Sequence, residues 1–159
     1  IHFPDSLKYQ TKKLARTVYG GGGIMPDFFV PIDTTQYTDY HRNIVAKGVV
    51  IKTTMKFIES HRKELQSKYK KFETFNDKFE ISDEILANMQ TLAEQEKIKF
   101  DEKQYQKSLP LIKTQLKALI ARDLWDMNEY FQIMNTTDSS VLQALKVLNE
   151  GAYEKVVRL

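Results

Sequence analysis

The sequence predicts a mainly α-helical fold, a helical bundle that is preceded by a short β-hairpin and an extended N-terminal arm. Two observations predict it. Residues 1–33 hold three of the four prolines and four of the six glycines. From residue 34 onward, apolar residues recur at intervals of three and four, the period of an amphipathic helix. We therefore divide the chain into an arm, residues 1–33, and a helical C-terminal domain, residues 34–159.

The arm contains three short runs with the composition of β-strands. "SLKYQTKK" (6–13) alternates apolar and polar residues, and "RTVY" (16–19) and "FFVPI" (28–32) are β-type runs on either side of four consecutive glycines. The sequence thus predicts, in order, a strand, a second strand, a glycine loop and an extended exit.

The first half of the helical domain predicts two helices and an aromatic segment. One helix begins near Tyr37 and breaks at Gly48, and its apolar residues are Tyr40, Ile44 and Val45. The next runs from about Val49 to Tyr69, with apolar residues near one face at Ile51, Met55, Ile58 and Leu65. A short aromatic stripe follows at Phe72, Phe75 and Phe79.

The second half predicts three further helices. Ser82 is the expected N-cap of a helix that buries Ile85, Leu86, Met89 and Leu92. Asp101 and Gln104 resemble a capping box of a short segment. The longest helix is then expected from a cap at Ser108 to Met134, roughly 40 Å long, with Pro110 in its first turn and Leu116, Leu119, Ile120, Leu124 and Phe131 buried. Asp138 is the expected cap of a last helix, which Gly151 ends.

Composition excludes several classes of protein. The net charge is +3, but lysines alternate with acidic residues, as in "KIKFDEKQYQK" (97–107), so we expect no nucleic-acid partner. There is no cysteine, which removes disulfides and thiolate chemistry, and no apolar run is long enough for a membrane span. The chain starts without Met and without a visible signal peptide, which is typical of an excised piece or a mature form.

No arrangement of residues predicts a cofactor, a metal ion or a catalytic group. The glycine run is followed by Ile24, Met25 and Pro26 rather than by the lysine and hydroxyl of a phosphate-binding loop. The histidines His2, His41 and His61 are scattered, so helix-flanking imidazoles are a better interpretation than a ligand set. Carboxylate pairs such as Asp83 with Glu84 fit capping or solvation, and Trp125 fits core packing.

One segment of the arm, "KYQTKKLARTVYGGGGIMPDFFVP" (8–31), resembles the end of the protease domain in the carboxyl-terminal processing, or tail-specific, serine peptidases. The matching residues are Tyr9, Thr11, Arg16, Val18, Gly20, Gly21, Gly22, Gly23, Ile24, Pro26, Asp27 and Val30. Ala15 stands where that family has a glycine before the arginine. The four-glycine form, and the tail segment "LKALIARDLWDMNEYFQIMN" (116–135), are similar to versions in the Bacteroides group.

The resemblance implies a parent enzyme, a serine endopeptidase of the periplasm or cell envelope that cleaves the C-terminal tails of proteins. Its serine nucleophile and lysine general base lie upstream of the segment found here, and neither Ser6 nor Lys8 fits their contexts, so no catalytic residue is assigned. The implied partners are the upstream peptidase and PDZ-like domains, protein substrates through the parent, and a possible second copy of the chain.

In that interpretation, residues 1–33 are the last β segment of the peptidase core, and the glycine run is the turn of a β-hairpin that closes it. The alternative from the residues alone is a free-standing helical interaction or scaffold domain with no enzymatic role. The sequence leaves both open.

Overall fold

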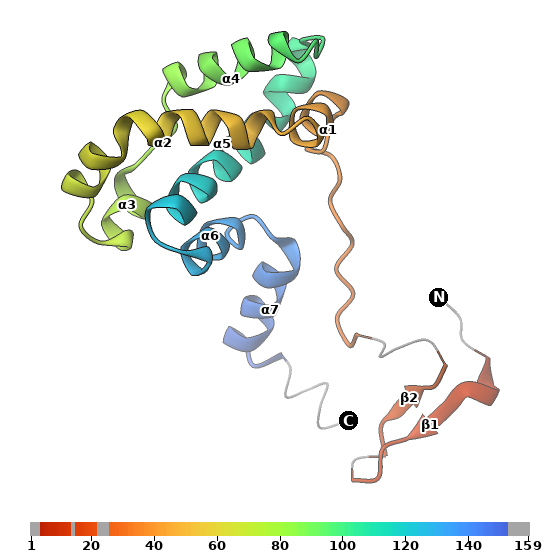
Figure 1. Ribbon diagram of the computed structural model, residues 1–159. Helices are drawn as coiled ribbons and strands as arrows, with labels where there is room; N and C mark the ends of the chain where they lie inside the picture. Colours follow the sequence, from red (N-terminus) through yellow and green to blue (C-terminus); the bar gives the residue numbers. More distant parts are fainter. Residues whose placement is uncertain (1–3, 14, 22–25, 153–159) are drawn as a thin grey trace. The chain divides into compact units, whose positions relative to one another are not determined.

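The computed structural model describes residues 4–13, 15–21 and 26–152 (Figure 1). Within them it is mainly helical, with seven α-helices, 65% helix and one short antiparallel hairpin near the N-terminus, so the predicted fold class is confirmed. The chain divides into two compact units. The first, which we call the bundle unit, is Asp33–Asp138, and the second, the arm unit, combines residues 1–32 with residues 139–159.

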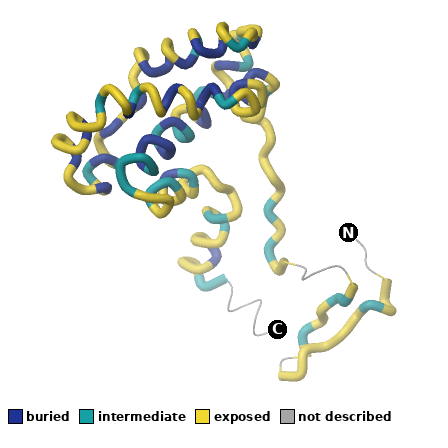
Figure 2. The backbone as a smooth tube through the Cα atoms, in the orientation of Figure 1, coloured by how far each residue is buried: buried dark blue, intermediate teal, exposed yellow. Residues whose placement is uncertain are grey.

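Six helices form the bundle unit: α1 (Asp39–Ala46), α2 (Val49–Lys68), α3 (Phe72–Lys78), α4 (Asp83–Gln95), α5 (Glu102–Leu124) and α6 (Met127–Met134). The helix α5 is central, because it packs against α1, α2 and α6, while α2 also packs against α4. Its side chains Ile112, Leu116 and Ile120 are completely buried. Figure 2 shows buried segments of α5 alternating with intermediate ones, as expected for the middle helix of a bundle.

The helix boundaries follow from caps that the sequence predicts. Gly48 separates α1 from α2 with a φ of +69°, a left-handed conformation that glycine adopts without a steric cost. The Ser82 hydroxyl accepts the Ile85 N–H at the start of α4. Asp101 likewise accepts the Gln104 N–H at 3.0 Å. Both the break at Gly48 and the cap at Ser82 are confirmed.

The prediction of one helix from Ser108 to Met134 is wrong in its start and in its continuity, because two helices, α5 and α6, cover this range. Asp101 caps α5 itself, which therefore begins at Glu102 and contains Pro110 in its interior rather than in its first turn. The helix ends at Trp125, whose ring packs against Phe72 and Phe75 with centroid distances of 5.9 and 5.3 Å. Asp126 then caps α6, because its carboxylate accepts the Met127 N–H at 2.6 Å. The apolar period of the sequence continues past this point, but the packed ring of Trp125 and the cap at Asp126 interrupt the helix.

The burial pattern also differs from the prediction on α2 and α6. Ile51 and Met55 are 46% and 59% exposed, and Phe131, expected in the core, is 52% exposed. Two threonines take core positions on α2 instead, Thr53 and Thr54. Their hydroxyls donate to the carbonyls of Val49 and Ile51, both at 2.8 Å, so burying them leaves no unsatisfied donor.

A group of polar residues, which we call the α1–α5 seam, joins the start of α1 to α5. The Ser108 hydroxyl, buried in the interior of α5 rather than at its cap, donates to the Gln36 carbonyl at 2.6 Å. Since that uses its single proton, Thr38 is the donor in the 2.8 Å contact between the Thr38 and Ser108 hydroxyls. Gln104 adds a bond from the Tyr40 N–H to its side-chain oxygen at 2.7 Å.

The arm unit contains a 3₁₀ turn (Asp5–Leu7), the strands β1 (Lys8–Gln10) and β2 (Thr17–Tyr19), and the helix α7 (Ser139–Asn149). The strands are antiparallel, with Tyr9 opposite Val18. The predicted β-type run 28–32 forms no strand. Gly151, with a φ of +63°, follows α7 as predicted. The helix buries Val147 but leaves three leucines about half exposed, Leu142, Leu145 and Leu148.

Candidate functional site

The residues of the peptidase-like motif gather around the β1–β2 turn. Thr11 and Arg16 frame that turn with two hydrogen bonds, because the Thr11 N–H donates to the Arg16 carbonyl at 3.0 Å and the Arg16 N–H donates to the Thr11 hydroxyl at 3.1 Å. The turn between β1 and β2 therefore comprises residues 11–16 and precedes the glycine run. Gly22, Gly23 and Ile24 lie outside the described residues.

Ala15 has a backbone conformation that is rare for a residue with a side chain. Its φ is +49°, and its N–H donates to the Thr11 carbonyl at 3.0 Å. The left-handed region costs a non-glycine residue roughly 1–2 kcal/mol, because Cβ approaches the following carbonyl oxygen. This position thus favours glycine on conformational grounds alone.

The first two glycines are needed for different reasons. The Gly20 N–H donates to the Leu7 carbonyl at 2.8 Å, and a Cβ at Gly20 would lie 2.8 Å from Cε2 of Tyr9. The tyrosine ring therefore packs against Gly20, and a side chain there would require this ring, which is 59% exposed, to move. Gly21 has a φ of +80°, so its requirement is conformational.

Arg16 and Asp27 form an ion pair across the glycine run, in which Nη2 of Arg16 donates to Oδ1 of Asp27. Their side chains are 25% and 47% exposed, so solvent screens the pair and it contributes at most about 1 kcal/mol. The ion pair instead fixes the position of the segment that follows the glycines, because it links this segment to the start of β2. We call Tyr9, Thr11, Arg16, Gly20 and Asp27 the motif cluster.

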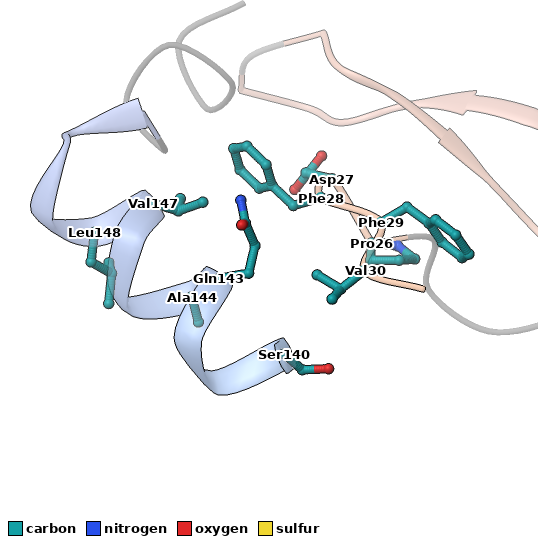
Figure 3. Close-up of a pocket in the computed structure, with 10 residues that line it drawn as sticks. All are labelled: Pro26, Asp27, Phe28, Phe29, Val30, Ser140, Gln143, Ala144, Val147 and Leu148. Atoms are coloured by element: carbon teal, nitrogen blue, oxygen red, sulfur yellow. The ribbon is translucent and has the colours of Figure 1, made fainter. Parts of the chain in front are cut away.

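Beside the motif cluster, the arm unit contains an apolar hollow of about 640 Å³ (Figure 3). One wall is the segment Pro26–Val30, and the other is one face of α7, from Ser140 to Leu148. Phe28, Val30 and Val147 supply much of its surface. Among the described residues of the lining, the carboxylate is that of Asp27, which is already bonded to Arg16. Such a lining can take up an apolar group, and it offers no paired acid and base for chemistry.

The comparison with known protein families gives one match, to residues 40–126, more than half of the chain. The matching model is described as a family of unknown function (DUF8443). The chain belongs to the DUF8443 family. The match runs from α1 to the cap of α6, and so lies within the bundle unit. Neither the curated proteins nor the solved structures include a match to the chain.

Within the DUF8443 region, two histidines have structural partners. Nε2 of His41 lies 3.0 Å from the side-chain oxygen of Gln115, and the His41 ring is buried. Nδ1 of His61 donates to the Phe57 carbonyl at 3.0 Å, and the two rings stack at 4.4 Å. Among the residues that the structure describes, no group of three or more histidines and carboxylates could hold a metal ion.

Four carboxylates of the DUF8443 region serve local structure. Asp83 and Glu84 lie in the first turn of α4, where negative charge opposes the helix dipole. Asp123 is bonded to the neighbouring Arg122, and Asp126 caps α6. None of the described helices is both long and apolar enough to cross a membrane.

Sequence reasoning missed one polar group in the DUF8443 region. The ammonium of Lys117 is partly buried at the junction of α3, α5 and α6, and it donates to the Asn76 carbonyl at 2.6 Å. Burial lowers the pKa of Lys117, an effect that Glu80 and Asp77 oppose. Its spacing on α5 is ordinary for a surface lysine, so only the packing of α3 and α6 reveals it.

Proposed function

We propose that the chain is the carboxyl-terminal accessory region of a tail-specific serine endopeptidase, an enzyme that cleaves the C-terminal tails of proteins with a serine nucleophile and a lysine general base. The catalytic serine, the lysine and a PDZ-like module would precede the arm in the natural protein. That protein would act in the periplasm or cell envelope. The chain itself would contribute no catalytic residue and require no cofactor.

The observation that carries this proposal is the conformation of Ala15. The peptidases that the arm resembles have a glycine at this position, before the arginine. Here the backbone has a φ of +49°, which suits glycine, although the side chain is alanine. The departure from the motif thus falls at a position whose backbone conformation favours glycine, which supports the proposal.

Two further contacts support the proposal. The ion pair between Arg16 and Asp27 joins the two halves of the motif, which the glycine run separates in sequence. The ring of Tyr9 lies against Gly20, where an added Cβ would come within 2.8 Å of it. Motif residues therefore contact one another, as residues with a shared structural role should.

A second candidate is a free-standing helical interaction domain. The extent of the family match favours it, because residues 40–126 include none of the motif residues. This candidate predicts no peptidase domain anywhere in the natural protein.

The reading frame upstream of the codon for Ile1 separates the two candidates. We expect it to encode a peptidase domain with a serine nucleophile and a lysine base. A start codon directly upstream would overturn the proposal and leave the interaction domain. The isolated chain should not hydrolyse casein in either case, since the proposal places the serine nucleophile and the lysine base upstream of it and the interaction domain has no enzymatic role.

Mutations in the peptidase-containing natural protein test the role of the motif cluster. Arg16→Asp should lower casein hydrolysis several-fold by breaking the ion pair with Asp27, and the added change Asp27→Arg should restore part of it. Lys12→Asp, at an exposed position of the same turn, is the matched control and should leave the activity unchanged. Equal activity of all variants would show that the activity of the enzyme does not depend on the motif cluster.

A further inference from the structure

A hollow of about 410 Å³ lies in the bundle unit where α3, α5 and α6 meet. Asn76 comes from α3, Glu80 from the α3–α4 connection, Lys113 and Lys117 from α5, and Thr136 from the end of α6. Its volume falls within the range of small-molecule sites, roughly 300–1,000 Å³.

Two lysines line this hollow from the same side of α5, since Lys113 and Lys117 are one helical turn apart. Neither forms a salt bridge with a carboxylate of the described residues. The Lys117 ammonium carries three protons, and the bond to the Asn76 carbonyl uses one. The helix α5 therefore presents unpaired positive charge and free donors.

Apart from the side-chain amide of Asn76, which can both donate and accept, the remaining polar side chains of the lining are acceptors. The Thr114 hydroxyl donates to the Pro110 carbonyl at 3.0 Å, and the Thr136 hydroxyl donates to the Ile133 carbonyl at 2.7 Å. Each hydroxyl has then used its single proton, so its oxygen can only accept from a ligand. Glu80 adds a carboxylate. Glu80 would repel a ligand that carries only negative charge, and the two lysines would repel a ligand that carries only positive charge.

The apolar part of the lining consists of three buried side chains, Phe79, Ile81 and Ile133. They offer hydrocarbon surface between the donors of α5 and the acceptors. A ligand that matches all three features has a carboxylate, an N–H-bearing cation and an apolar side chain.

We propose that this hollow binds a free amino acid or a short peptide with an apolar side chain, with its α-carboxylate on Lys113 and Lys117 and its α-ammonium toward Glu80. The site belongs to the bundle unit alone, so it goes beyond the proposed function and does not depend on it. Of the three charged groups, Lys117 is partly buried, so water screens its attraction for a carboxylate less than at an exposed position.

The test uses the full chain, labelled with ¹⁵N, and NMR titration with the dipeptide L-leucyl-L-leucine. We expect saturable shifts at millimolar concentrations, confined to the amides of residues 76–81, 113–117 and 133–136. N-acetyl-L-leucine, which lacks the ammonium, and L-leucinamide, which lacks the carboxylate, should each bind more weakly. Absence of saturable shifts in these segments would overturn the proposal, as would equal binding of the three probes.

Variants identify the groups responsible. Lys117→Met should weaken binding of the dipeptide at least about tenfold, a loss of about 1.4 kcal/mol. Lys103→Met, an exposed lysine elsewhere on α5, is the matched control and should bind as the parent does. If Lys117→Met fails to fold, Glu80→Gln decides, because this residue is exposed. Glu80→Gln should weaken the dipeptide but not N-acetyl-L-leucine, and an unchanged dipeptide affinity in either folded variant would overturn the assignment.

Discussion

Lys97 is a lysine in a position that suits glycine. It follows the C-cap of α4 with a φ of +56°. Its N–H donates to the Glu94 carbonyl at 2.8 Å, and the Ile98 N–H donates to the Ala93 carbonyl at 2.9 Å. These two bonds form a Schellman motif, which satisfies the last carbonyls of the helix and needs one left-handed residue.

Lys97→Gly should therefore stabilise the bundle unit by about 1 kcal/mol. The relief of strain at Cβ, roughly 1–2 kcal/mol, exceeds the cost of the extra freedom that glycine has in the unfolded chain, roughly 0.4–1 kcal/mol. Urea unfolding followed by circular dichroism measures the change. Lys99→Gly, two residues further on and without a positive φ, should give no gain, and equal midpoints for the two variants would contradict this explanation.

Tyr40 is a second residue whose environment has a measurable consequence. Its ring packs edge-on against Phe100 and Tyr105, and its buried hydroxyl has no hydrogen-bond partner among the described residues. Burial, with smaller contributions from Tyr105 and Glu94, raises the pKa of Tyr40 from 10.0 to about 12. The unfolded chain thus releases this proton at a lower pH than the folded chain.

Between pH 10 and 12, ionisation of Tyr40 should favour the unfolded state, and the stability present below pH 10 should be lost progressively. The shift corresponds to at most about 3 kcal/mol. Tyr40→Phe should remove this part of the alkaline loss and should be neutral or slightly stabilising at pH 7, because an unsatisfied hydroxyl disappears. Urea unfolding across this pH range tests it, with Tyr37→Phe as the control that should keep the parent's sensitivity. Parallel profiles for all three proteins would refute the role of Tyr40.

At the scale of whole helices, the sequence predicts the caps and breaks that depend on neighbouring residues better than it predicts which face of a helix is buried. Gly48, Ser82 and Gly151 act as predicted, because a left-handed turn or a cap depends on neighbouring residues only. The division of the long helix at Trp125 depends on Phe72 and Phe75, far away in sequence. Apolar periodicity also cannot show which faces lack a neighbour, so Ile51 was expected in the core.

A pair of substitutions on α5 and α6 tests this difference. Leu119 and Phe131 belong to the same predicted apolar stripe, but Leu119 is 8% exposed and Phe131 is 52% exposed. Leu119→Asp should unfold the bundle unit, because it places an unpaired charge in the core. Phe131→Asp should retain the helical circular dichroism and lower stability by less than about 1 kcal/mol. Similar melting curves for the two variants would show that α6 is not packed as described.

Sequence patterns also could not predict much of the candidate site, because its contacts depend on residues that are brought together only in the folded chain. The resemblance identified Arg16 and Asp27 but could not show that they pair, since the pairing depends on the path of the chain around the glycines. Lys117 carried no signal at all. Its environment is created by α3 and α6, which approach α5 only in the folded bundle.

At the scale of the molecule, the division into two units suggests that the bundle unit folds alone. The fragment Asp33–Asp138 contains α1–α6 and the whole buried cluster that these helices share. We expect it to keep its helical circular dichroism and to unfold cooperatively.

The same fragment should also self-associate less than the full chain in sedimentation velocity. It lacks the exposed apolar residues of the arm unit, among them Tyr9, Val18, Phe29 and the three leucines of α7. A fragment that unfolds without cooperativity would mean that residues outside 33–138 complete its core, and undiminished association would place the contact surface on the bundle unit.

The α1–α5 seam bears on how far the chain between α1 and α5 can change in length. Docking α1 on α5 brings together Thr38 and Ser108, which are 70 residues apart. The entropic cost of closing such a loop grows only with the logarithm of its length, and doubling it would add about 0.6 kcal/mol. A few residues inserted into the α3–α4 connection would therefore scarcely affect the closure of the bundle. The junction is maintained by the bonds between two hydroxyls and a carbonyl at its ends, and not by the shortness of the chain between them.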